Sequence, residues 1–175
     1  MSDRDADFEH QRHKPPTPLD RPRELVIACA PLRSNVNLSR IVRAAGCCGV
    51  LRVICCGHAR VIDKIARDSV DADLPTGVTI EVHRTLEPQL VRLRSEGYRL
   101  VGLEQTTGSR CLYEFPFPRN TALVIGNERQ GLDEAVLSLL DDVVEIPVYG
   151  RPLAHNVATA TAMAMYEYCR QYPRG

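Results

Sequence analysis

The sequence predicts an α/β domain in which a parallel sheet carries helices on both faces. Short apolar runs, typical of buried strands, alternate along the chain with segments whose apolar residues recur at helical spacing. Such alternation favours parallel strands joined by crossover helices. The length of 175 residues suits one domain, which we assign to residues 25–175. Residues 1–24 are polar and are expected to form a flexible N-terminal tail.

The first half of the domain begins with a strand and a helix. Residues 25–30 form an uninterrupted apolar run, as in a buried strand. Ser34, Asn35 or Asn37 can cap the following helix, which Gly46 or Gly49 ends. Next come an apolar strand at residues 50–56, a weaker helical pattern at 62–70 and an alternating strand at 79–83.

The second half continues the alternation. An amphipathic helix at residues 86–96 stops at Gly97. We then expect strands at residues 99–103, 121–125 and 143–148, with a helix at 133–140 before the last strand. A long helix over residues 155–171 closes the chain. Its first half is rich in alanine and threonine, so a backbone can approach it closely, either inside the fold or across a subunit interface.

Composition and charge exclude several classes of protein. With 44% hydrophobic residues the chain is too apolar for general disorder, and no apolar run approaches the roughly 20 residues that cross a bilayer. The first 24 residues lack the apolar core of a signal peptide, so we expect a cytoplasmic protein. The 22 basic residues balance 22 acidic ones, which argues against a uniformly basic body but permits a local anion-binding patch. Nearly all basic residues are arginine, which suits phosphate, although codon bias would give the same count.

The seven cysteines show no metal-binding pattern. None forms a CxxC pair, and the adjacent pairs Cys47–Cys48 and Cys55–Cys56 lie in apolar stretches. We therefore expect most of them to pack in the core, and we expect no metal.

Four loops follow expected strands and are rich in polar residues, at residues 31–37, 104–110, 126–131 and 149–156. Ligands of open α/β sheets bind beyond the carboxyl ends of the strands. The loop from Gly126 to Gly131 is neither a GxGxxG fingerprint nor a P-loop. It is either a tight turn or a loop that approaches a flat ligand, with Glu128 and Arg129 pointing toward a second substrate.

Further candidates each have an ordinary structural interpretation. Arg40 and Arg43 share a helix face, which is either a solvated surface or a clamp for a phosphate or ribose. Asn156 is either a simple helix cap or the donor of an amide to a ligand.

Read in order, these segments resemble the SpoU/TrmH-type ribose methyltransferases of the SPOUT class. The matching segments are residues 37–46 with Gly49-Val50, residues 123–132, and residues 146–150 leading to Asn156-Val157 and the Ala/Thr-rich helix. The resemblance implies S-adenosylmethionine as methyl donor and a ribose 2′-hydroxyl of tRNA or rRNA as acceptor. It also implies a C-terminal trefoil knot and a homodimer.

The resemblance assigns roles to particular residues. Arg43 matches the family's catalytic arginine, and Asn37, Glu128 and Asn156 match the motif residues expected around it. Contacts to the cofactor would map to Leu103, Gly126, Ile146 and His155. Because arginine stays protonated, we expect Arg43 to hold the phosphate and polarise the hydroxyl rather than to act as a simple base.

The third motif departs from the family pattern. The family commonly reads Ser-Leu-Asn-Val-Ser, whereas this chain has Ala154, His155 and Ala158 at the first, second and last of these positions. Both hydroxyls are absent, which keeps open a weakly active or inactive RNA-binding protein that retains the cofactor pocket. An unrelated nucleotide-binding α/β enzyme is a third alternative.

Overall fold

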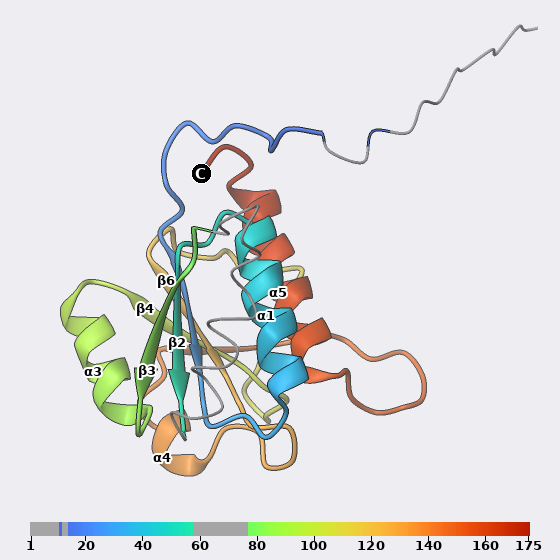
Figure 1. Ribbon diagram of the computed structural model, residues 1–175. Helices are drawn as coiled ribbons and strands as arrows, with labels where there is room; N and C mark the ends of the chain where they lie inside the picture. Colours follow the sequence, from blue (N-terminus) through green and yellow to red (C-terminus); the bar gives the residue numbers. More distant parts are fainter. Residues whose placement is uncertain (1–10, 12–13, 58–76) are drawn as a thin grey trace, which may run out of the picture.

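The computed structural model describes residues 11, 14–57 and 77–175. Within them, seven strands form one sheet in the order β3-β2-β1-β6-β4-β7-β5, and every pairing is parallel. The strands are β1 (Leu25–Cys29), β2 (Arg52–Cys56), β3 (Thr79–His83), β4 (Arg99–Leu103), β5 (Arg110–Cys111), β6 (Thr121–Ile125) and β7 (Asp142–Glu145). Parallel pairing places all their carboxyl ends at one edge of the sheet, the lower edge in Figure 1.

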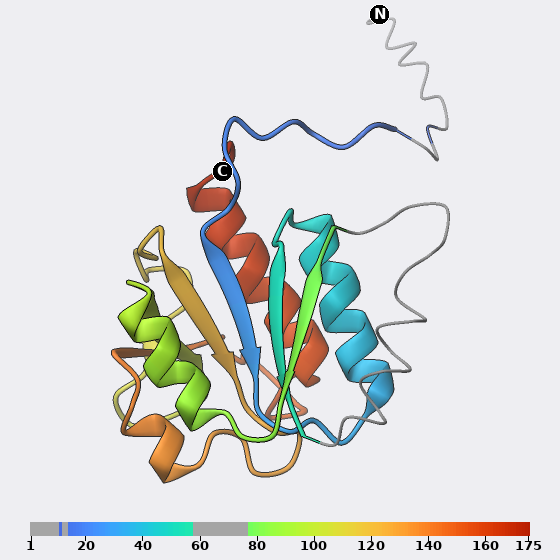
Figure 2. The ribbon, with the colours of Figure 1, turned by 60° about the vertical axis from the view of Figure 1, so that its left-hand side comes forward.

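Helices cover both faces of this sheet, as predicted. Helices α1 (Asn35–Cys47) and α5 (Val157–Gln171) lie side by side on one face, and α3 (Glu87–Ser95) and α4 (Glu134–Leu137) lie on the other (Figures 1 and 2). Strand β1 is buried throughout because Leu25, Ile27 and Cys29 face the first pair of helices while Val26 and Ala28 face the second. Its uninterrupted apolar run is therefore explained by burial on both sides.

Most expected elements occur close to their expected bounds. Strands β3, β4 and β6 coincide with the expected ranges, and Ser34 caps α1 by accepting a hydrogen bond from the amide of Asn37. Helix α4 is shorter than residues 133–140, and β7 begins and ends earlier than residues 143–148. Strand β5 was not expected. The helical pattern at residues 62–70 lies outside the described residues.

Residues just before the domain assigned to 25–175 contact the end of the chain. Arg23 donates hydrogen bonds to the carbonyl oxygens of Cys48 and Tyr172, and Arg174 forms an ion pair with Asp20. Figure 2 shows this segment beside the end of α5, at the amino edge of the sheet. Residues 20–23 and the C-terminal segment thus lie at the amino edge, whereas the carboxyl edge carries the loops that sequence analysis singled out.

The cysteines are all free thiols. Four of them, Cys29, Cys48, Cys55 and Cys56, are buried, as core packing predicts, whereas Cys47 is exposed. In the described part of the chain, no helix combines the length and the apolar character needed to span a bilayer.

Candidate active site

A cavity of about 420 Å³ opens at the carboxyl edge of the sheet. Its walls come from the loops after β4, β6 and β7 and from the first turn of α5. This volume lies in the usual range for small-molecule sites, which is roughly 300–1,000 Å³. Its lining residues are Leu103, Glu104, Gln105, Ile125, Gly126, Asn127, Glu128, Arg129, Gln130, Gly131, Glu145, Ile146, Val148, Ala154, His155, Asn156, Val157 and Ala160.

The Glu128 carboxylate joins the loop after β6 to the start of α1. It accepts hydrogen bonds from the backbone amides of Arg33 and Ser34, at 2.8 and 2.9 Å, and from the side-chain amide of Asn37 at 3.0 Å. Partial burial raises the pKa of Glu128, but the hydrogen bonds from Arg33 and Asn37 outweigh it and hold that pKa below its usual value. Glu128 is therefore ionised at neutral pH and fixes two loops to each other.

Asn37 and Asn156 extend this connection to α5. The side-chain nitrogen of Asn156 donates to the side-chain oxygen of Asn37 at 3.1 Å. The side-chain oxygen of Asn156 in turn accepts from the amides of Ala158 and Thr159 and so caps α5. Asn156 acts as a cap and as a link at once, so the two interpretations from the sequence are not exclusive.

Close backbone packing shapes the loop between Gly126 and Gly131. A Cβ atom on Gly126 would lie 2.4 Å from the backbone carbonyl carbon of Gly131, so only glycine fits there. Gly131 has a φ of 65° and faces Glu104, whose carboxylate accepts a hydrogen bond from the amide of Leu132 at 2.9 Å. Both glycines are thus required by geometry, and the tight turn itself forms the cavity wall.

The cavity combines apolar walls with acidic groups. Leu103, Ile125 and Ile146 offer apolar surface to a flat ring. Glu104 and Glu145 add carboxylates, and the Glu145 carboxylate accepts a hydrogen bond from the hydroxyl of Ser109 at 2.6 Å. Such a site suits a small organic ligand that has a flat apolar ring and polar groups.

Most of the predicted site residues converge on this cavity. Leu103, Gly126, Ile146, His155, Glu128 and Asn156 all line it. Asn37 does not line it but is hydrogen-bonded to two residues that do, Glu128 and Asn156. Arg43 does not line it. Arg43 is exposed on α1. It lies six residues after Asn37, which places it about 9 Å further along the helix axis.

Two acidic lining residues were missed by sequence reasoning. Glu104 lies in a loop that was singled out, but no role was given to its side chain, and Glu145 was treated as part of a strand. Glu104 directly follows the apolar strand at residues 99–103, and that position was the available signal. Glu145 lay inside the expected strand at residues 143–148, so no comparable signal marked it.

Together, the fold and the cavity define a class: an α/β domain with a cavity of small-molecule size at the carboxyl edge of a parallel sheet. The chain belongs to the SpoU rRNA Methylase family, whose model matches residues 24–166. The resemblance to SpoU/TrmH enzymes is thereby confirmed.

Relatives and solved structures agree with this assignment. The chain is 39% identical over 82 residues to the tRNA (guanosine(18)-2'-O)-methyltransferase TARBP1 of Mus musculus, covering 47% of this chain and 5% of that protein. It is 27% identical over 151 residues to the tRNA (guanosine(18)-2'-O)-methyltransferase of Aquifex aeolicus, covering 86% of this chain and 71% of that one. The crystal structure of the SpoU methyltransferase AviRb from Streptomyces viridochromogenes in complex with AdoMet aligns with a TM-score of 0.73 at 25% identity, covering 89% of this chain and 63% of that one.

Proposed function

We propose that this protein transfers the methyl group of S-adenosylmethionine to a ribose 2′-hydroxyl of tRNA or rRNA. One observation carries the proposal: three segments far apart in the sequence are hydrogen-bonded into one cavity through Glu128, Asn37 and Asn156. Membership of the SpoU family and the activities for which the relatives are named support it. Because all seven cysteines are free, we also propose a reducing compartment, the cytoplasm.

The residues present fit the methyl donor. We propose that Leu103, Gly126, Ile146 and His155 surround its adenosine, since they contribute apolar surface and closely approaching backbone to one cavity. The carboxylates of the cavity complement the positive charges of its ammonium and sulfonium groups. When bound, S-adenosylmethionine supplies an electrophilic methyl group.

The chain's own residues must then position the acceptor. A ribose hydroxyl has to lose its proton as it attacks, and Arg43 is a poor base because its guanidinium stays protonated. We assign Arg43 to hold the adjacent phosphate and polarise the hydroxyl, with the proton leaving to water or a neighbouring group. Most of the rate gain would come from proximity and in-line alignment, for which the bonded loops provide a rigid frame.

We further propose a homodimer that meets through the outer faces of α1 and α5. Large apolar side chains are exposed there, with Val36 and Tyr166 more than half accessible and Met163 at 39%. Exposed apolar faces of this kind are typical of subunit interfaces. Arg43 lies on the exposed side of α1, so dimerisation would place it at the boundary between the two subunits.

We also propose the trefoil knot, formed within residues 25–175. The segment between β5 and β6 is bonded to the end of α5: the side-chain amide of Gln171 donates to the carbonyl of Phe115 at 2.9 Å, and the hydroxyl of Tyr168 donates to the carbonyl of Arg119 at 2.6 Å. Such a contact between an internal loop and the C-terminal helix supports a chain end threaded through that loop.

The experiment is methyl transfer from labelled S-adenosylmethionine to bulk tRNA and to rRNA, followed by digestion and mass spectrometry of the nucleosides. We expect the label on 2′-O-methylated ribose. Label on a base, or no transfer to either RNA, would reject the proposal.

A weakly active or inactive RNA-binding protein is the second candidate, because Ala154 and Ala158 carry no hydroxyl in the third motif. Ala154 lines the cavity, so a bound ligand cannot form a hydrogen bond with a side-chain hydroxyl at this position. The variant Ala154→Ser separates the two candidates. A wild-type chain that binds donor and RNA without transfer, and an Ala154→Ser chain that transfers, would favour the second.

A further inference from the structure

Among the described residues, the arginines at the two edges of the sheet differ in their partners. At the amino edge of the sheet they are paired: Arg94 with Asp141 at 3.0 Å, Arg99 with Asp142 at 2.7 Å and Arg174 with Asp20 at 3.0 Å. At the carboxyl edge, the exposed guanidinium groups have no hydrogen-bond or ion-pair partner among the described residues. These are Arg33, Arg84, Arg129 and Arg151.

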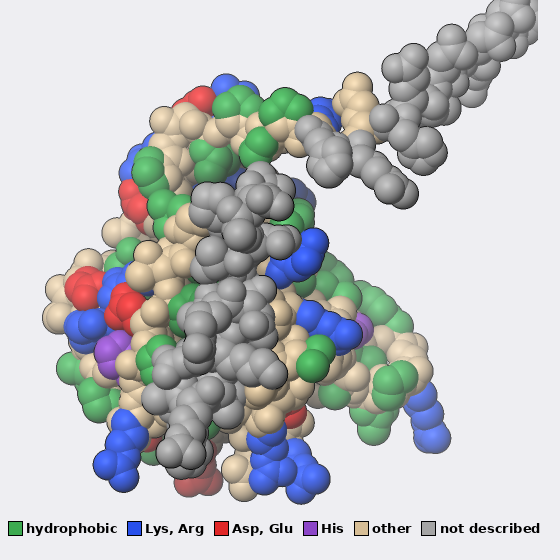
Figure 3. Space-filling model, viewed as in Figure 1, with side chains coloured by type: hydrophobic (Ala, Val, Ile, Leu, Met, Phe, Trp, Pro, Cys, Tyr) green, Lys and Arg blue, Asp and Glu red, His purple; other side chains and the backbone are tan. Residues whose placement is uncertain are grey.

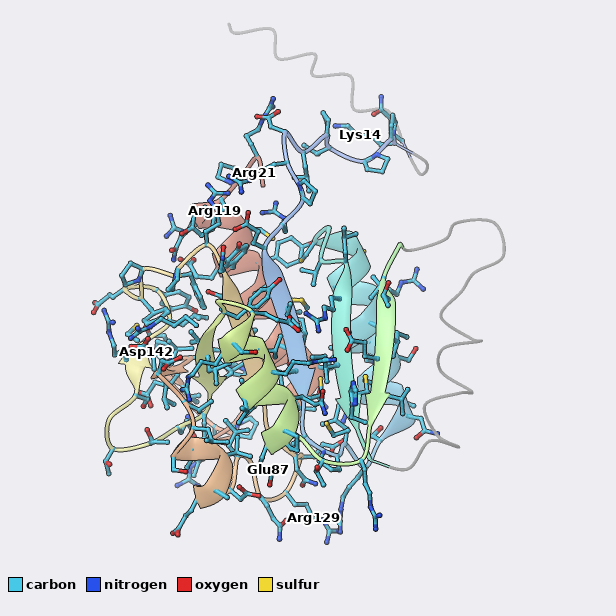
Figure 4. The ribbon with its side chains drawn as sticks, turned by 90° about the vertical axis from the view of Figure 1, so that its left-hand side faces the viewer. Lys14, Arg21, Glu87, Arg119, Arg129 and Asp142 are labelled. Carbon is cyan, nitrogen blue, oxygen red and sulfur yellow. The ribbon has the colours of Figure 1, made fainter. Side chains whose placement is uncertain are left out.

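These four arginines are spread across the width of the sheet. Arg84 follows β3, Arg33 follows β1, Arg129 follows β6 and Arg151 follows β7. Five strand spacings separate β3 from β7 in the sheet order, so the four residues span about 24 Å. Figure 3 shows basic side chains gathered along this lower end of the molecule, and Figure 4 shows Arg129 projecting from it.

Within the described residues, none of the acidic groups nearby forms an ion pair with these four arginines. The carboxylates of Glu128 and Glu104 accept hydrogen bonds from backbone amides inside the site. Glu87 and Glu134 lie at the same end but on α3 and α4, which cover the face of the sheet opposite α1. In a chain with no net charge, the arginines therefore create a local positive field along one edge.

We propose that Arg33, Arg84, Arg129 and Arg151 form a phosphate-binding track for the RNA substrate. The track passes the mouth of the cavity at Arg129 and continues away from it, past β1 and β2, to Arg84. The RNA backbone would lie along the carboxyl edge, which brings one ribose to the cavity while neighbouring phosphates are held by guanidinium groups. This inference rests on the proposed function and assigns contacts far from the reacting group.

The test is the salt dependence of RNA binding. The edge variant carries alanine in place of Arg33, Arg84 and Arg151. Arg129 is kept in it because this residue lines the cavity. The control triple, with Arg94, Arg99 and Arg174 replaced by alanine, removes the same charge from the amino edge. The dissociation constant for bulk tRNA is measured between 50 and 200 mM salt, and binding of S-adenosylmethionine is measured for every chain.

Each phosphate contact adds about 0.7 to 0.9 to the slope of log affinity against log salt. Losing three contacts should lower the slope by about 2 to 3, so the rise in salt weakens the wild type about 20- to 40-fold more than the edge variant. The control should keep the wild-type slope, and both variants should bind S-adenosylmethionine as the wild type does. Equal slopes for the two variants would overturn the track while leaving the proposed function intact. A wild-type chain that binds S-adenosylmethionine but no RNA would overturn both.

Discussion

Replacing Glu128 by glutamine should weaken the hydrogen bonds that connect the loop after β6 to the start of α1, with almost no change in the size of the side chain. One carboxylate oxygen accepts from the amide of Ser34 and from Asn37, and the other accepts from the amide of Arg33. Glutamine retains one acceptor oxygen and presents a donor to the remaining amide. A hydrogen bond to a charged group contributes about 1.5–3 kcal/mol, a neutral one about 1 kcal/mol, and a donor without a partner is costly.

The expected loss of stability follows from these bonds. Three charge-assisted bonds become two neutral ones and one unmatched donor, which would cost about 4 kcal/mol at a fully buried site. Because Glu128 is only half-buried, we expect about 2 kcal/mol after screening by solvent. For a chain of this length that lowers the melting temperature by about 4–8 °C. Glu114→Gln, at an exposed position, is the matched control and should have almost no effect.

The pH dependence has a definite sign. The folded-state pKa of Glu128 lies below its usual value of 4.5, so its contribution is fully present above that value and is lost as pH falls through the folded pKa. Thermal denaturation of both chains at pH 7 and at decreasing pH should show a difference that shrinks below about pH 4.5. Equal melting temperatures at pH 7, or a difference unaffected by acid, would refute the structural role assigned to this carboxylate.

Three further substitutions test the site and the assembly. Arg43→Ala should lower turnover by about two orders of magnitude and leave S-adenosylmethionine affinity almost unchanged, whereas Arg40→Ala on the same exposed helix face should retain turnover; equal rates for both would remove Arg43 from the mechanism. Gly126→Ala should weaken S-adenosylmethionine binding by calorimetry at least about tenfold, because its Cβ would overlap the backbone of Gly131, while Gly108→Ala has open space and should bind normally. Sedimentation equilibrium should give about 39 kDa for the wild type, twice the 19.5 kDa of one chain, and a monomer for Tyr166→Glu, since a charge on the proposed interface opposes association. A wild-type monomer would contradict the proposed dimer.

The sequence predicts the buried elements better than the short or exposed ones. Strands such as β6 are recognisable because burial on both faces demands an uninterrupted apolar run. Strand β5 has only two residues, Arg110 and Cys111, which is too short to show any period. Periodicity also carries no information on which strands become neighbours, so the position of β6 between β1 and β4 had to come from the structure.

The site was predictable in its loops and less so in its connections. Strand ends and polar loops indicate where a ligand binds, and the motifs add the residues that match the family. The hydrogen bonds between Asn37, Glu128 and Asn156 join positions up to 119 residues apart, and no local pattern encodes such contacts. Glu104 illustrates the same limit, because its role depends on the amide of Leu132 in another loop.

A crystal structure of the protein grown with S-adenosylmethionine tests the central claim most directly. The account predicts electron density for the donor between Leu103, Gly126 and Ile146, with its methyl group open to the carboxyl edge of the sheet. Donor bound elsewhere, or the cavity left empty at saturating donor, would contradict it.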